Sequence, residues 1–179
     1  MILYHLAATA TVTGRVVEIG SFLGRSTLWL AHGVRHAGAG HVVAIDPHEG
    51  HERPDIEPGV DTYAAFLEHV RQASVDDVVE PIRERSQRVA ERWCEPMRLL
   101  WVDGSHDYQD VRADLEGFAP HVRPGGYVAL HDTRGGHFPG VRKAMLEFFA
   151  RHPEFTRTSA LRNMSVYARG PGPCPRQTG

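Results

Sequence analysis

The chain has 179 residues, 41% of them hydrophobic, and its 20 basic and 22 acidic residues leave a formal net charge of −2. This length suffices for one domain with a sizeable core, and the scattered charge argues against nucleic acid as the main partner. No signal peptide or membrane-spanning run is visible, so no membrane association is expected, and two distant cysteines, Cys94 and Cys174, favour a reducing cytoplasm.

The first predicted strand, Val16–Ile19, carries an acid and runs into a glycine loop. Gly20 and Gly24 let the backbone turn tightly and approach a ligand without interference from a Cβ atom. The second residue after Gly20 is Phe22, so the Gly-x-Gly-x-x-Gly spacing of dinucleotide sites is absent. The carboxylate of Glu18 repels a pyrophosphate and attracts an ammonium or a sulfonium. The loop therefore predicts a nucleoside-type cofactor with a cationic part.

A helix is predicted over Arg25–Arg35 directly after this loop, with Ser26 and Thr27 as caps. The next predicted strand, Val42–Ile45, ends in Asp46. Nucleoside-binding folds place an acid for the ribose hydroxyls at about this distance from the glycine turn. Each residue alone has a structural alternative as a turn, cap or loop residue, but their joint order favours a cofactor site.

Strands and helices continue to alternate toward the C-terminus, which predicts a parallel sheet. The further predicted strands are Val78–Ile82, Leu99–Val102 and Tyr127–Leu130, and the further helices are Tyr63–Ala73, Gln87–Trp93, Val111–His121 and Val141–Arg151. Two final runs, Phe155–Ser159 and Met164–Ala168, have no helix between them and predict an antiparallel pair. The breaker-rich tail 170–179 is predicted to be disordered, which leaves a single domain over residues 1–169.

In open α/β sheets, ligands bind beyond the carboxyl ends of the strands. The residues that follow the predicted strands, and therefore should share one rim, are Gly20, Asp46, Ser86, Asp103, His131 and Asp132. The residues predicted to form buried helix faces are Phe66, Val70, Val111, Leu115, Phe118, Met145, Phe148 and Phe149. The tryptophans expected in the core or in helix packing are Trp29, Trp93 and Trp101.

Four stretches together resemble class I S-adenosylmethionine-dependent methyltransferases: 18–24, Asp46, 103–108 and 124–132. The resemblance runs from about Arg15 to Ala168 and is to the small-molecule O-methyltransferase branch that includes macrolide-sugar and cephalosporin-biosynthesis enzymes. It implies a Rossmann-like α/β fold with a seven-stranded, mostly parallel sheet, an antiparallel last strand and helices on both faces. It also implies an enzyme of secondary metabolism that methylates a hydroxyl of a small molecule, such as a natural product or a sugar.

Carried over by position, the resemblance places Glu18 near the methionine part of the cofactor, with Gly20 and Ser21 in the turn beneath it. Asp46 is expected to hold the ribose hydroxyls, and Ser86 to lie near the adenine edge. The other residues expected to bind S-adenosylmethionine are Phe22, Gly24, Ser26, Asp103 and His106. Relatives often carry an acid immediately before the serine, and this chain has Arg85 there.

A hydroxyl acceptor needs a base or a metal ion to activate it. Asp103 and Asp132 offer hard oxygen ligands for Mg²⁺ or another divalent cation, and His131 stands where metal-binding relatives often have an acid. His106, three residues after Asp103, is the expected proton acceptor. Metal-bound and metal-free sites both stay open at this point, as do two roles for His131, third metal ligand or second base. The catalytic candidates are therefore Asp103, His106 and His131.

Two loops are candidates to cover the acceptor. One is Pro47–Pro58, with His48 and His51, and the other is Thr133–Gly140, with His137 and Phe138. The alternatives are a solvated loop and an ordinary connection to the following helix.

Two other functions stay open on the sequence. One is an enzyme that binds the same cofactor without methylating its substrate, and the other is a non-catalytic cofactor-binding module. The chain reaches its first strand almost directly, whereas many relatives have N-terminal helices that cover the acceptor. We therefore expect an open pocket or one that is completed by a second subunit in a homodimer.

Overall fold

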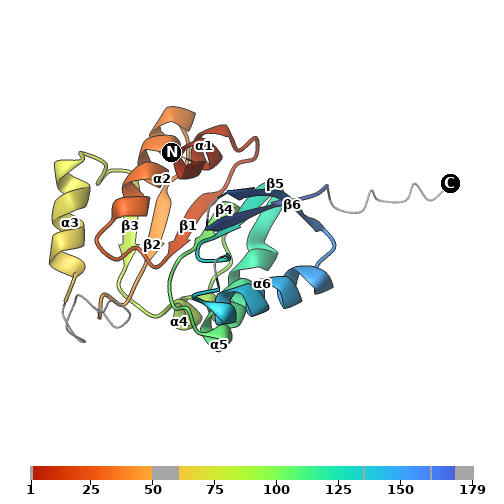
Figure 1. Cartoon of the computed structure of the whole chain (residues 1–179). Helices are drawn as coiled ribbons and strands as arrows, with labels where there is room; N and C mark the ends of the chain where they lie inside the picture. The colour runs from red at the N-terminus through yellow and green to blue at the C-terminus, as the bar shows by residue number, and fades with distance from the viewer. Residues whose placement is uncertain (1, 50–60, 135, 162, 172–179) are drawn as a thin grey trace.

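The computed structural model describes residues 2–49, 61–134, 136–161 and 163–171. Its strands are β1 (Arg15–Ile19), β2 (Val42–Ile45), β3 (Val79–Ile82), β4 (Met97–Val102), β5 (Val122–Leu130), β6 (Phe155–Leu161) and β7 (Met164–Arg169). They form one seven-stranded sheet in the order β3-β2-β1-β4-β5-β7-β6, flanked by helices (Figure 1).

The first five strands are parallel to one another, and β7 runs antiparallel to both of its neighbours, β5 and β6. The predicted seven-stranded sheet with an antiparallel last strand is confirmed. All six residues of β4 and all four of β2 are buried, because strands at the centre of a parallel sheet are covered on both faces.

The helices are α1 (Ile2–Thr9), α2 (Arg25–Ala37), α3 (Tyr63–Gln72), α4 (Ser86–Ala90), α5 (Tyr108–Phe118) and α6 (Pro139–Arg151), with a 3-10 turn η1 (Ala119–His121) after α5. One hydrophobic cluster joins the sheet to α1, α2 and α3, and the other joins it to α4, α5 and α6. The eight residues predicted to form buried helix faces are all buried. Helices therefore cover both faces, as the sequence predicted.

The helix α1 was not among the predicted elements, so the expectation that the chain reaches its first strand almost directly is wrong. This helix packs closely on α2 at Gly33. A Cβ atom at Gly33 would lie only 2.5 Å from the Tyr4 carbonyl oxygen and 2.8 Å from the Ala7 Cβ, so the two helices could not pack this closely with a larger residue there. The α1 segment has only eight residues and no charged group in its first or last turn, so the usual signals of a helix end are missing.

Most of the predicted helices differ from the observed ones by one to three residues at one or both ends, and the largest differences are in α4 and α5. The helix α4 ends at Ala90, three residues before the predicted end, and the indole N–H of Trp93 beyond it donates to the Glu95 carbonyl oxygen at 2.8 Å. The helix α5 begins at Tyr108, three residues earlier than predicted, directly after the loop that follows β4.

Several predictions concern residues outside the described part of the chain. These include most of the loop Pro47–Pro58 with His51, most of the tail from residue 172 onward, and Cys174. Within the described ranges, we find no helix with both the length and the apolar character that crossing a membrane requires.

Candidate functional site

A cavity of about 800 Å³ lies at the carboxyl edge of the sheet, where β1, β2, β4 and β5 end. Its volume is in the ordinary range for small-molecule sites. The predicted site residues that line it are Gly20, Ser21, Phe22, Ser26, Asp46, Ser86, Asp103, His106, His131 and Asp132. The strand ends therefore bring together the residues that the sequence predicted to share one rim.

At Gly20, the glycine loop contributes only its main chain to the cavity wall. Gly20 has φ +86, and a Cβ atom there would lie 2.3 Å from the Asp103 carbonyl oxygen. Phe22 also has a positive φ, of 48, which is uncommon for a bulky residue. The end of β1 thus passes so close to the end of β4 that only glycine fits at position 20.

Asp46 fixes this loop from the end of β2. Its Oδ2 accepts the backbone N–H of Phe22 at 2.8 Å, and its Oδ1 accepts the N–H of His48 at 2.6 Å. A carboxylate oxygen has more than one acceptor position, so both oxygens can still accept a bond from a hydroxyl in the cavity. The arrangement holds the carboxylate in a fixed orientation at the cavity wall.

Glu18 and Gly24 lie behind the loop and are not among the residues that line the cavity. The Glu18 side chain is fully buried and accepts a hydrogen bond from the Thr27 hydroxyl through Oε2, while Oε1 has no hydrogen-bond partner among the described residues. Burial raises the pKa of Glu18 to about 8. Gly24 lies against the ring of Phe66. The predicted contact of Glu18 with the methionine part of a cofactor stays a prediction.

The end of the cavity near β3 contains a buried acid that the sequence analysis missed. Ser86 donates a hydrogen bond from its hydroxyl to Asp114 Oδ1 at 2.6 Å, and burial raises the pKa of Asp114 to about 7. Gln87 also lines the cavity, and its amide donates to Asp110 Oδ1 at 3.2 Å. Asp114 sits on the buried face of α5 beside Val111 and Leu115, and an acid on an apolar helix face is the signal that could have revealed it.

The opposite end of the cavity carries a cluster of two aspartates and two histidines. His131 Nδ1 lies 3.3 Å from Asp103 Oδ1 and 3.1 Å from Asp132 Oδ2, and His106 Nε2 lies 2.8 Å from the same Asp132 oxygen. Asp132 adopts φ +51, and its other oxygen accepts a hydrogen bond from the Asn163 amide. Asn163 comes from the turn before β7, so sequence spacing gave no indication of it.

The charges of this cluster depend on one another. A hydrogen bond to Asp103 and the nearby carboxylate of Asp132 raise the pKa of His131 to about 9, against the opposing effect of burial. Burial is the main reason that the pKa of Asp103 is raised. Without a bound cation, His131 therefore carries a proton near neutral pH and balances the two carboxylates.

The same three residues have the composition of a metal site. One ligand atom from each of Asp103, His131 and Asp132 can be chosen so that all three lie within 4.8 Å of one another. Two carboxylate oxygens and one imidazole nitrogen fit a divalent cation that accepts mixed oxygen and nitrogen ligands. Coordination by His131 requires the loss of its Nδ1 proton.

An apolar wall adjoins this cluster. It consists of Leu3, Trp29, Trp101 and Met164, and all four residues line the cavity. Trp29 was expected in the core or in helix packing; it is 44% exposed and lines the cavity, so the core placement is wrong. Trp101 is buried as predicted and its ring meets His131 edge-on, with the ring centres 5.9 Å apart. Trp93 is partly buried against the core, also as predicted.

The two predicted covering loops differ in outcome. Phe138 lines the cavity and stacks on His106 with a ring-centre distance of 3.8 Å, whereas His137 is exposed and does not line the cavity. His48 is buried, with Nδ1 3.0 Å from the Thr62 hydroxyl oxygen, and it packs against Phe66 outside the cavity lining. His48 therefore packs beneath the loop that follows β2 and is not part of the cavity wall.

Comparisons with known proteins agree with this architecture. A family model described as a methyltransferase domain matches residues 17–133. The uncharacterized protein y4gI of Sinorhizobium fredii is 28% identical over 150 residues, which cover 78% of this chain. The chain spans only 15% of that relative and 50% of another curated relative that it matches.

Solved structures share the fold at low sequence identity. The O-methyltransferase NovP superposes with a TM-score of 0.81 at 16% identity, over 95% of this chain and 78% of NovP. The O-methyltransferase TomG from Streptomyces achromogenes, solved in complex with S-adenosylmethionine, superposes with a TM-score of 0.71 at 19% identity, over 95% of this chain and 78% of TomG. With the family match over most of the sheet, these findings show that the chain belongs to the methyltransferase domain family and has the Rossmann-like methyltransferase fold that its motifs predicted.

Proposed function

We propose that the protein transfers the methyl group of S-adenosylmethionine to a hydroxyl oxygen of a small molecule. One observation carries the proposal: a single cavity joins the glycine loop and Asp46 at one end to the His106–Asp132 pair at the other. A cofactor at the first end and an acceptor at the second would meet in its middle. The O-methyltransferase activity in the names of NovP and TomG supports the same assignment.

The cofactor end of the cavity suits a nucleoside attached to a cationic group. Asp46 offers acceptors for ribose hydroxyls, and Ser86 and Gln87 lie where an adenine would follow along the rim. Asp103, partly exposed in the cavity with its main chain next to Gly20, would supply negative charge for the ammonium or sulfonium. The Gly20 backbone allows the closest approach.

Methyl transfer needs alignment and a deprotonated nucleophile. The acceptor oxygen attacks the methyl carbon in line, a C–O bond forms, the C–S bond breaks, and sulfur retains the electron pair as a neutral thioether. His106 takes the hydroxyl proton, and the Asp132 carboxylate at 2.8 Å stabilises the imidazolium that results. Stacking on Phe138 fixes the plane of the His106 ring.

A divalent cation is compatible with this site, and Asp103, His131 and Asp132 would hold it. When bound, it would supply a Lewis acid that lowers the pKa of the acceptor hydroxyl. Asn163 holds Asp132 in position whether or not a cation is present, through its bond to the other carboxylate oxygen.

The test is a screen of hydroxylated small molecules with methyl-labelled S-adenosylmethionine, run with and without a chelator. We expect label in at least one product, together with an equal amount of S-adenosylhomocysteine. Loss of activity with the chelator and recovery with added Mg²⁺ or Mn²⁺ would establish the metal requirement. Turnover of an acceptor without S-adenosylhomocysteine would instead identify a non-methylating enzyme, and cofactor binding without turnover would indicate a binding module.

A further inference from the structure

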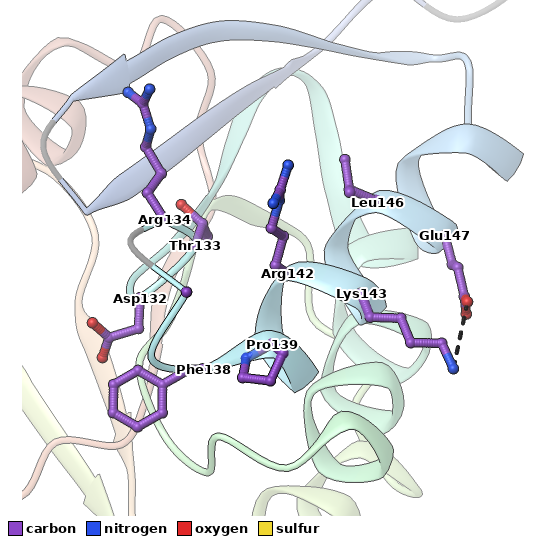
Figure 2. A pocket seen from close by; sticks show the side chains of 10 residues that line it. Asp132, Thr133, Arg134, Phe138, Pro139, Arg142, Lys143, Leu146 and Glu147 are labelled. Atoms are coloured by element: carbon purple, nitrogen blue, oxygen red, sulfur yellow. Dashed lines mark ion pairs between the residues drawn. The ribbon is translucent and has the colours of Figure 1, made fainter.

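A second cavity, of about 430 Å³, borders the main one on the side of α6 (Figure 2). The loop after β5 and the first turns of α6 line it, and it shares Asp132 and Phe138 with the main cavity. The two cavities therefore meet at Asp132 and Phe138, next to the position proposed for the acceptor hydroxyl. No part of the proposed methyl-transfer chemistry uses this space.

Three cationic side chains line the second cavity, namely Arg134, Arg142 and Lys143. Figure 2 shows the Arg134 and Arg142 side chains extending from the loop and the helix toward the same side, while the Asp132 carboxylate points away from them. Both lining acids already have partners. Asp132 bonds to Asn163 and pairs with His106, and Glu147 accepts the Tyr108 hydroxyl hydrogen bond at 2.6 Å.

Arg142 has no ion pair with any described residue, and it is exposed. Arg134 uses one guanidinium nitrogen to donate to the Ala160 carbonyl oxygen at 3.3 Å, which leaves its other N–H groups available to a ligand. Lys143 lies 4.5 Å from the centre of the Tyr108 ring and 4.0 Å from Glu147. The two arginines are therefore the main unneutralised charges of the cavity.

Their position carries an electrostatic cost. Arg142 lies in the first turn of α6 and Lys143 follows it, and no acidic residue stands in that turn. Cations at the N-terminal end of a helix meet the positive end of its dipole, which is unfavourable. An anion bound between the guanidinium groups would offset this cost and would gain charge-assisted hydrogen bonds from both.

We infer that this second cavity binds an anionic oxygen group of the acceptor, a phosphate or a carboxylate, through Arg134 and Arg142. The inference rests on the proposed function, because it places the acceptor hydroxyl at Asp132. The exposed side chain of Leu146, also in the lining, offers an apolar contact to the adjoining part of such an acceptor. The protein would thus select negatively charged acceptors over neutral ones of the same size.

The experiment titrates the full chain, saturated with S-adenosylhomocysteine, with three probes of similar shape: phenyl phosphate, benzoate and benzyl alcohol. Binding is followed by ligand-observed NMR on the wild type, on the double variant Arg134→Gln/Arg142→Gln and on Arg151→Gln. Arg151 lies on the same helix outside both cavities and serves as the matched control. Thermal unfolding of each variant checks that it is folded.

We expect at least one anionic probe to bind the wild type about tenfold more tightly than benzyl alcohol, to lose that advantage in the double variant and to keep it in Arg151→Gln. The stronger of the two anions identifies phosphate or carboxylate as the group. Equal binding of benzyl alcohol, or anion binding that is unchanged in the double variant, would overturn the inference.

Failure of this inference and failure of the proposed function give different results. The proposed function places S-adenosylhomocysteine at the other end of the main cavity, so its affinity should be the same in the wild type and the double variant. If the wild type does not bind S-adenosylhomocysteine, the proposed function fails. If it does bind and the anionic probes show no preference, only the second cavity has been misassigned.

Discussion

The two ends of the main cavity are held in place by different kinds of contact. At the proposed cofactor end, main-chain contacts hold the loop in place: Gly20 packs against the Asp103 carbonyl, and the two Asp46 oxygens accept main-chain N–H groups. At the proposed catalytic end, the wall is a cluster of ionisable side chains around Asp132 and His131. The cofactor end is thus fixed by chain geometry and the catalytic end by charge, and variants at the two ends should fail in different ways.

The largest expected effect is at the catalytic end. We expect His106→Gln to lower the rate of methyl transfer by about 10²- to 10⁴-fold, the usual contribution of a general base, while the affinity for S-adenosylhomocysteine changes little. Activity on an acceptor found in the screen and calorimetry with S-adenosylhomocysteine measure the two quantities. His152→Gln is the control, because His152 also pairs with an acid, Glu154 at 3.0 Å, but outside the cavity. An equal loss of cofactor affinity in His106→Gln would contradict the division between the two ends.

At the cofactor end, we expect Gly20→Ala to weaken S-adenosylhomocysteine binding on the order of 100-fold and to lower the free energy of unfolding by about 3 kcal/mol, because backbone strain adds to a steric overlap. Gly38→Ala is the matched control, since Gly38 also has a positive φ but a Cβ atom there would meet nothing within 4 Å. It should cost only about 1–2 kcal/mol and leave cofactor binding unchanged. Equal effects of the two variants would show that the close approach to Asp103 is unimportant.

An effect on stability, with none expected on catalysis, concerns its pH dependence. The pKa of Asp114 is raised by burial to about 7, so between about pH 4 and pH 7 the folded state holds a proton that the unfolded state has released, and stability falls as the pH rises. The slope from this group is at most ~1.4 kcal/mol per pH unit, and it ends above pH 7. Asp114→Asn should remove that contribution.

Urea unfolding of the wild type and of Asp114→Asn across this pH range measures the difference between the two curves, so the separate contribution of buried Glu18 cancels. The exposed Asp77→Asn is the control. Parallel curves for the wild type and Asp114→Asn would contradict the assignment of a protonated Asp114.

The smallest expected effect is on the apolar wall. Trp29→Ala should raise the KM for the acceptor by about tenfold, through the loss of roughly 1.4 kcal/mol of contact, with kcat and cofactor affinity nearly unchanged. Trp29→Phe keeps an aromatic surface and should recover most of the loss. A change in S-adenosylhomocysteine affinity that matches the change in KM would place Trp29 at the cofactor end instead.

Much of the fold could be predicted from the sequence because its signals are local. Apolar runs such as Val42–Ile45 and helix faces such as Val111, Leu115 and Phe118 carry their own periodicity. The sequence has no helical pattern between the last two apolar runs, and this indicated the antiparallel pair of β6 and β7. The helix α1 was missed because its eight residues carry no terminal charges and are stabilised by packing on α2 at Gly33.

The candidate site was predictable where a strand end alone positions a residue, as for Gly20, Asp46 and Asp103. The contacts between those residues were not, because they join distant segments. His106 and Asp132 are separated by 26 positions, and Asn163 lies 31 residues after Asp132. Trp29 was misplaced for a related reason: a tryptophan on a helix looks like a core residue until the neighbouring elements show which side is open.

Cofactor binding is measured most directly by a calorimetric titration of the intact, folded chain with S-adenosylhomocysteine, followed by the same titration of Gly20→Ala and Gly38→Ala. We expect one site per chain with a dissociation constant in the range of about 1 μM to 1 mM that is ordinary for enzyme ligands, a large loss of affinity in Gly20→Ala and none in Gly38→Ala. Absence of binding to the wild type at millimolar ligand would contradict the proposed function.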